Sequence, residues 1–132
     1  MASPPALDGL RVLVIDDNED ATECVAWVFN DAGANVRVAN DATCIADLIQ
    51  DFDPGLVLLD LSLPKVDGYE ACRIVRQLKG AAPFVVAVTG WGSVEDRERS
   101  MRHGFDLHLA KPVAGDAFIE LGMLAFERSL QG

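Results

Sequence analysis

Five polar residues at the ends of apolar segments carry the chemistry that this sequence could perform. They are the acidic pair Asp16 and Asp17, the single acid Asp60, Thr89 and Lys111. Clustered carboxylates repel one another, so they need a cation or raised pKa values. Oxygen ligands without His or Cys favour Mg²⁺ or Mn²⁺. A carboxylate beside such an ion, with an ammonium and a hydroxyl nearby, is suited to accept a phosphoryl group.

Asp60 has the position that a reactive acid needs in an open parallel sheet. It follows Leu56–Leu59, an apolar run typical of a strand buried on both faces. Pro64 and the pair Asp67-Gly68 predict a loop after it. Open parallel sheets bind their ligands at the carboxyl ends of strands. We therefore expect Asp60 to be a nucleophile that receives a phosphoryl group.

Three further residues fit the same reaction. Lys111 would supply positive charge for the developing oxyanion, and Thr89 would supply a hydroxyl donor. Gly90, which follows Thr89, leaves space for an incoming phosphodonor.

Alternating strands and helices must position these residues. The predicted strands are Arg11–Ile15, Val36–Ala39, Leu56–Leu59, Phe84–Val88 and Asp106–Ala110. The predicted helices are one that Asn18 caps and Gly33 ends, Asp41–Gln50, Gly68–Leu78, one that Ser93 caps, and Gly115–Leu130. This alternation predicts an α/β fold with a doubly wound, five-stranded parallel sheet and helices on both faces. In the flavodoxin-like strand order 2-1-3-4-5, all five polar residues lie at carboxyl ends of neighbouring strands.

Length and charge limit the classes of function. The 132 residues suit one domain, which we expect at residues 10–132 after a flexible tail at residues 1–9. A net charge of -10 argues against nucleic acid and anionic membrane surfaces as partners. No apolar run is long enough to span a bilayer. The three cysteines show no CxxC spacing and no signal peptide is recognisable, which predicts small core or near-core residues in a reducing, cytoplasmic protein.

The chain resembles the response-regulator receiver domains of two-component signalling from Leu10 to Leu130. The resemblance rests on the acidic pair after the first strand, on Asp60 within Leu-Leu-Asp-Leu-Ser-Leu-Pro-Lys-Val-Asp-Gly, on Thr89 and on Lys111-Pro112. It implies that Asp60 is the phosphoacceptor.

The resemblance also implies roles for the surrounding residues. Asp17 would bind Mg²⁺ directly, Asp16 mainly through water, and the backbone carbonyl of Ser62 would be a further ligand. Pro112 would make a cis bond with Lys111 that directs the lysine toward the phosphate.

Receivers of this kind take the phosphoryl group from a phosphohistidine on a histidine kinase or a histidine phosphotransfer domain. They catalyse their own phosphorylation and dephosphorylation, so turnover of an external substrate is not expected. The acyl phosphate then draws the threonine inward and reshapes the face made by the fourth helix, fifth strand and fifth helix. That face would bind a second copy or an output partner.

Two positions depart from the usual pattern. The family carries Tyr or Phe where this chain has His108, which is either a half-exposed edge-strand residue or a ring that takes the switching role. Trp91, two residues after Thr89, either shields the phosphate or is an exposed loop aromatic. The Thr-Gly-Trp-Gly turn is similar to that of receivers attached to hybrid sensor kinases.

Two helices carry more apolar residues than one core face needs. Trp27 lies outside the core stripe of the first helix and either packs on a neighbouring loop or contacts a partner. The last helix has one stripe with Ile119, Met123, Phe126 and Leu130 and a second with Phe118, Leu121 and Ala125. One stripe must cover the sheet, and we expect the other to be an interface.

Three other functions would require a different set of residues or would not require this one. A haloacid-dehalogenase-type phosphatase would have Asp-x-Asp after the first strand, where position 18 is Asn. A flavodoxin-like FMN module would have a phosphate-binding loop there, which the run of acids from Asp16 to Asp20 would repel. A degenerate receiver, which acts through protein contacts alone, would not need the intact acidic set.

Overall fold

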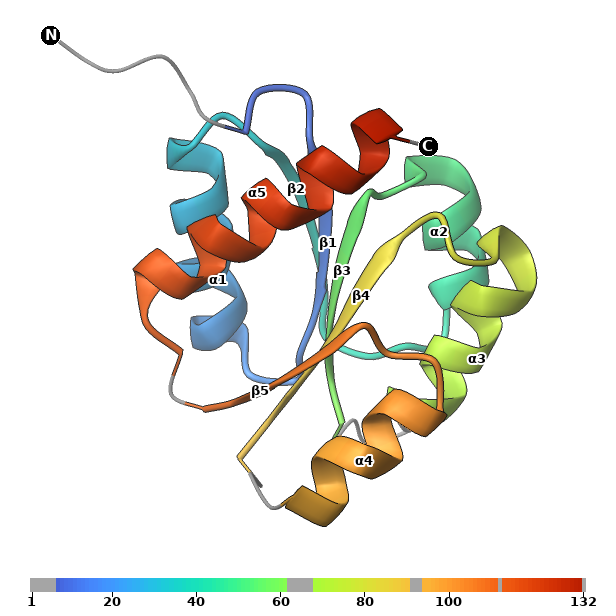
Figure 1. The fold of residues 1–132 in the computed structure, drawn as a ribbon. Coiled ribbons are helices and arrows are strands. Elements are labelled where there is room, and N and C mark those ends of the chain that lie inside the picture. The colour runs from blue at the N-terminus through green and yellow to red at the C-terminus, as the bar shows by residue number, and fades with distance from the viewer. Residues whose placement is uncertain (1–6, 62–67, 91–93, 112, 132) are drawn as a thin grey trace, which may run out of the picture.

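The chain folds into a five-stranded parallel sheet between two layers of helices (Figure 1). The computed structural model describes residues 7–61, 68–90, 94–111 and 113–131, with the backbone alone at 94–97 and 129–131. The strand order is β2-β1-β3-β4-β5, and every neighbouring pair is parallel. The predicted fold class and strand order are confirmed.

The elements follow the apolar pattern of the sequence. The strands are β1 Arg11–Ile15, β2 Asn35–Ala39, β3 Leu56–Asp60, β4 Phe84–Thr89 and β5 Leu107–Ala110. The helices are α1 Glu19–Asp31, α2 Ile45–Phe52, α3 Gly68–Lys79, α4 Val94–Arg102 and α5 Gly115–Gln131. Helix α2 begins four residues later than predicted, because the carboxylate of Asp41 accepts hydrogen bonds from Thr43 and holds this stretch as a turn.

Each face of the sheet has its own core. Side chains alternate along a strand, so Val12 and Val14 of β1 point to one face while Leu13 and Ile15 point to the other. The first face is covered by α1 and α5, and the rings of Phe29 and Phe118 meet edge to face there. The second face is covered by α2 and α3. All five residues of β3 are buried, as the continuous apolar run predicted.

The ends of α1 form as the sequence predicts. The side chain of Asn18 accepts a hydrogen bond from the N–H of Ala21, at 3.1 Å, and so caps the first turn. Gly33 follows the helix with a φ of 96°, a backbone conformation that glycine adopts without strain. Because β1 leads directly into this cap, the acids at the end of β1 are held between two rigid elements.

Strands β4 and β5 are tied together at their amino ends by Asp106. One carboxylate oxygen of Asp106 accepts from the backbone N–H of Val85 (2.9 Å) and from the guanidinium of Arg76 (2.7 Å). The other lies 2.8 Å from the guanidinium of Arg128 on α5. Arg76 also donates to the carbonyls of Gly104 and Pro83. This ion-pair network fixes β5 against α3 and α5.

The folded part begins before the predicted boundary at residue 10. The side chain of Leu7 is completely buried, and its backbone N–H donates to the carbonyl of Ala32 at 2.9 Å. Leu7 fits here because α5 has a glycine opposite it: a Cβ on Gly122 would lie 2.5 Å from a Leu7 methyl group. The expected tail is therefore wrong at Leu7, which belongs to the core beside Phe29.

Several expected core positions are exposed. Cys24 and Cys44 are exposed, and among the three cysteines only Cys72 is buried as predicted. Composition alone placed the two exposed cysteines in the core, whereas helix phase and the turn before α2 turn them outward. Leu78, an apolar residue at the end of α3, is also exposed.

The surplus apolar residues of α1 and α5 are now placed. Trp27 is 69% exposed, so it does not pack on a neighbouring loop in the part of the chain that the structure describes. On α5, the stripe with Phe118, Leu121 and Ala125 covers the sheet. In the other stripe Met123 is exposed, while Ile119 and Phe126 are partly buried. The predicted Ser93 cap lies outside the described residues.

Candidate functional site

Two acids leave β1 at the carboxyl edge of the sheet. Asp16 is 7% exposed, and its Oδ1 accepts from the N–H of Asn18 at 3.0 Å. Its own carbonyl accepts from the side chain of Asn40, which follows β2. Asp17, the next residue, is exposed. The first acid is thus fixed by its backbone surroundings, whereas the second reaches into solvent.

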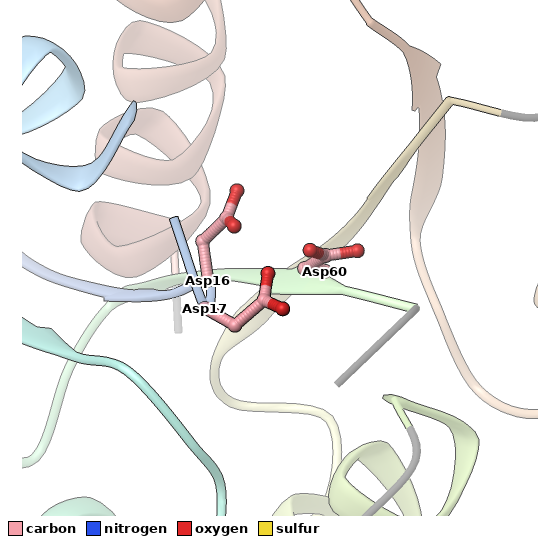
Figure 2. A group of neighbouring side chains, drawn as sticks. All are labelled: Asp16, Asp17 and Asp60. Carbon is pink, nitrogen blue, oxygen red and sulfur yellow. The ribbon is translucent and has the colours of Figure 1, made fainter. Parts of the chain in front are cut away.

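Asp60 is the last residue of β3 and is 5% exposed. The parallel register pairs it with Val88 of β4, and the next residue, Leu61, donates its N–H to the carbonyl of Val88. The β1–β3 register sets Ile15 beside Leu59, so Asp16 and Asp60 both emerge one residue later. Figure 2 shows the carboxylates of Asp17 and Asp60 directed toward the same space, with Asp16 beside them.

These three carboxylates form one cluster. One oxygen from each of Asp16, Asp17 and Asp60 lies within 4.8 Å of the others. Charges of the same sign at this separation repel, and the low polarity around two buried members strengthens that repulsion. Such a cluster is stable when a cation compensates it.

Lys111 provides part of that compensation. Its Nζ lies 2.9 Å from Oδ2 of Asp16 and 3.6 Å from Oδ2 of Asp60. Burial alone would lower the pKa of Lys111, but the hydrogen bond to Asp16 and the negative charges of Asp60 and Asp16 raise it. Burial would likewise raise the pKa of Asp16, but the hydrogen bonds from Asn18 and Lys111 hold it below its ordinary value. Both groups are therefore ionised at neutral pH.

Thr89 ends β4 on the other side of Asp60. It is almost completely buried, and its carbonyl accepts from the backbone N–H of Lys111 at 2.7 Å. This bond keeps the hydroxyl-bearing and ammonium-bearing residues at the same edge. Gly90, which follows, is exposed, and a Cβ there would meet no described atom within 4 Å. Space for an incoming phosphodonor beside Gly90 stays a prediction from the sequence.

The donor set fits a hard divalent cation. Mg²⁺ and Mn²⁺ prefer oxygen ligands, and Mg²⁺ commonly binds one or two carboxylates while retaining water. Three convergent carboxylates, one of them exposed at Asp17, meet that requirement. No histidine or cysteine belongs to the cluster, so its chemistry does not favour zinc.

His108 lies in the middle of β5 beside Ala87 of β4. It is 7% exposed, so the expectation of a half-exposed edge residue is wrong. Its Nδ1 lies 3.1 Å from the hydroxyl of Ser100, which is completely buried on α4. Helix α4 therefore covers the His108 ring and contacts it through Ser100. The strand pattern alone did not indicate this contact.

Three other predicted site residues, Ser62, Trp91 and Pro112, lie outside the described residues. Three residues with a part in the site were missed by the sequence analysis: Asn40, Ser100 and Gly68. Asn40 follows a strand at the same edge as the acids, which was a usable signal. Gly68 is needed because a Cβ there would lie 2.8 Å from the Cα of Leu61, next to Asp60.

Comparisons with known proteins agree with this geometry. The model of the response regulator receiver domain family matches residues 12–121. An uncharacterized 14.6 kDa protein of Leptolyngbya boryana is 36% identical over 105 residues, which cover 79% of this chain and 80% of that protein. Response regulator MprA of Mycobacterium sp. (strain KMS) is 34% identical over 105 residues, which cover 80% of this chain and 45% of MprA. The chain thus spans less than half the length of MprA.

Among solved structures, the receiver domain of the Francisella response regulator 1452 is similar to this chain. It has a TM-score of 0.84 and 25% sequence identity, over 92% of this chain and 99% of that one. The sequence match, the strand order and the acidic cluster agree on one assignment. This chain belongs to the response-regulator receiver domain family of two-component signalling.

Proposed function

We propose that Asp60 accepts a phosphoryl group from the phosphohistidine of a histidine kinase or histidine phosphotransfer domain, with Mg²⁺ or Mn²⁺ bound at the acidic cluster. The observation that carries this proposal is the convergence of Asp16, Asp17 and Asp60 beside the Lys111 ammonium. Three carboxylates of like charge gathered beside a lysine at one edge of the sheet are costly to fold, and phosphoryl transfer would make use of all four groups.

The reaction needs a nucleophile and preset charge stabilisation. An oxygen of Asp60 forms the new P–O bond, and the P–N bond of the phosphohistidine breaks. The electron pair of that bond returns to the imidazole nitrogen, which takes up a proton. Lys111 lies close enough to Asp60 to pair with the phosphoryl oxygens, and the Thr89 hydroxyl would donate to them.

The acids beside Asp60 would hold the metal ion. Asp17 would bind it directly because its carboxylate is exposed, while Asp16, already hydrogen-bonded to Asn18 and Lys111, would act mainly through water. The Ser62 carbonyl remains an expected ligand. When bound, the ion neutralises charge on the phosphoryl oxygens. Dephosphorylation would use the same residues with water as the attacking group.

Phosphorylation would be read out at the α4–β5–α5 face. Inward rotation of Thr89 would change the space beside β5, and His108 connects that strand to Ser100 on α4. We propose that this face binds a second copy or an output partner. Comparing His108→Tyr and His108→Ala, each phosphorylated and free, tests the ring: if neither alters the spectral response, His108 has no switching role.

Other proposals from the sequence stand apart from the structure. We propose that Trp91 shields the phosphate, and an unchanged phosphate lifetime in Trp91→Ala would contradict this.

We also propose a cytoplasmic location, without nucleic acid or membrane as partners. None of the helices in the described part of the chain has the length and apolar character that crossing a bilayer requires.

The direct test is incorporation of phosphate. The protein is incubated with acetyl phosphate and Mg²⁺, and its intact mass should rise by one phosphoryl group. Reduction with borohydride then marks the modified acid for peptide mapping, which should identify Asp60. Asp60→Asn should take up none, whereas Asp53→Asn, which changes an exposed acid away from the cluster, should behave like the parent. Incorporation that is unchanged in Asp60→Asn or after chelation would refute the proposal, and no incorporation in the parent would favour a degenerate receiver.

A further inference from the structure

An apolar cavity lies behind the acidic cluster, between the sheet and α1. Its volume is about 290 Å³. Its floor is formed by the β-strand side chains Val14, Leu58 and Val88, and Phe118 of α5 closes one side. Its apolar lining residues Val14, Leu58, Val88 and Phe118 belong to the core layer between the sheet and α1 and α5.

The two ends of the cavity differ in chemistry. Asp16, Asp60 and Lys111 line the end at the edge of the sheet. Ala21 and Cys24 of α1 line another wall, and Cys24 is exposed, so this wall reaches the surface. Apart from the three charged residues, the lining that the structure describes is aliphatic or aromatic with one thiol.

The size and lining define the ligand that would fit. A cavity of roughly 150 Å³ lined by aliphatic and aromatic side chains stays dry and binds benzene. This cavity is about twice that size, which corresponds to roughly ten to twelve non-hydrogen atoms. The two carboxylates at one end can accept hydrogen bonds from a donor group on the ligand.

We infer that this cavity binds a small, neutral aromatic molecule that carries one hydrogen-bond donor. Apolar walls gain dispersion contacts with such a ring and lose their exposure to water. A ligand of this size has a dissociation constant on the order of 1 mM unless it is tethered. The ring would lie next to Asp60, on the side of the phosphoacceptor that faces the core. The binding itself does not depend on phosphoryl transfer.

Cys24 allows a direct test, with Cys44 as a control in the same molecule. Both thiols are exposed, but only Cys24 lines the cavity. The probe is the mixed disulfide of 2-phenylethanethiol and cysteamine, and the reference is the mixed disulfide of 2-mercaptoethanol and cysteamine. The Cys24 thiolate attacks the probe, forms a new disulfide with the phenylethyl sulfur and releases cysteamine, which takes up a proton. Peptide mapping gives the ratio of labelling at Cys24 to labelling at Cys44.

The ratio obtained with the phenylethyl probe is divided by the ratio obtained with the reference, which removes differences in thiol reactivity. We expect this quotient to be about ten or more, because a ring bound in the cavity raises the probe concentration beside the Cys24 thiol. Ala21→Leu fills the cavity and should bring the quotient close to one. Ala26→Leu makes the same change at another partly buried position of α1, outside the cavity lining, and should leave it high.

Two results would overturn the inference: a quotient near one in the parent, or a high quotient that persists in folded Ala21→Leu. If circular dichroism shows that Ala21→Leu does not fold, Val25→Met replaces it, because Val25 lines the same wall. Labelling requires neither Mg²⁺ nor a phosphodonor. Its failure is therefore distinguishable from failure of the proposed phosphoryl transfer.

Discussion

Replacing Asp106 with Asn tests the network that fixes β5 at the end of the sheet opposite the acidic cluster. The side chain of Asp106 is 22% exposed and accepts from Arg76, Arg128 and the N–H of Val85. Hydrogen bonds to charged groups contribute about 1.5–3 kcal/mol each, exposed ion pairs contribute about 0–1, and breaking a fully buried pair costs about 3–5. Asn keeps one acceptor but loses the charge, and the guanidiniums remain partly solvated. We therefore expect a loss of about 2 kcal/mol in the free energy of unfolding.

The matched control is Asp53→Asn. Asp53 also lies near two cations, Arg11 and Lys79, but its side chain is 58% exposed. Its φ of 50° is one that Asn tolerates, so the backbone is not strained by the change. Both substitutions remove one negative charge from an acidic protein, so the general relief of repulsion is the same. The control should change the free energy of unfolding by no more than about 0.5 kcal/mol.

The assay is urea unfolding followed by circular dichroism at several pH values. Burial alone would raise the pKa of Asp106, but the hydrogen bonds from Val85, Arg128 and Arg76 lower it below its ordinary value. A lowered pKa in the folded state stabilises the protein fully above the unfolded pKa of about 3.9, and this contribution is lost as the pH falls from there through the folded pKa. The difference in the free energy of unfolding between the parent and Asp106→Asn should therefore have its full value at pH 7 and decrease below about pH 4. Equal losses for both variants, or a difference that does not change with pH, would refute the reasoning.

Three further predictions address the backbone, the thiols and the metal. Gly68→Ala should destabilise the protein by about 1–3 kcal/mol in urea unfolding, because the added Cβ meets the backbone of Leu61, whereas Gly115→Ala at the first residue of α5 has room and should not. Burial raises the pKa of the Cys72 thiol to about 11, so at pH 8 an aromatic disulfide reagent should titrate two thiols in the folded protein and three in urea; three in the folded protein would contradict this. Asp17→Asn should weaken Mg²⁺ binding at least tenfold by calorimetry, whereas Glu19→Gln should not, and equal affinities would exclude Asp17 as a ligand.

The fold was predictable because the three central strands, β1, β3 and β4, are largely apolar runs. Leu56–Leu59 has the pattern of a strand buried on both faces, and alternation with helices then favours a parallel sheet. The convergence of Asp16, Asp60 and Lys111 followed from that topology without any knowledge of side-chain positions. Strand ends are the part of such a fold that sequence specifies best, since each residue after a strand lies at the same edge.

Contacts between elements were the part that sequence did not specify. The hydrogen bond between His108 and Ser100 depends on how α4 lies on β5, which periodicity does not determine. Leu7 was assigned to a tail because Ser3-Pro4-Pro5 precedes it, although its partner glycine lies on α5, far along the chain. Cys24 was placed in the core on residue type, but the phase of α1 turns it outward. Each of these depends on tertiary packing rather than on a local pattern.

The buried Leu7 has a mechanical consequence for anything joined to the amino end of this domain. Its side chain lies against Phe29 of α1 and Gly122 of α5, and its backbone is bonded to the carbonyl of Ala32. A pulling force applied ahead of residue 7 would therefore load α1 and α5 before it reached β1. Single-molecule extension from this end should show those helices yielding first, and Leu7→Ala should transfer the load directly to the sheet.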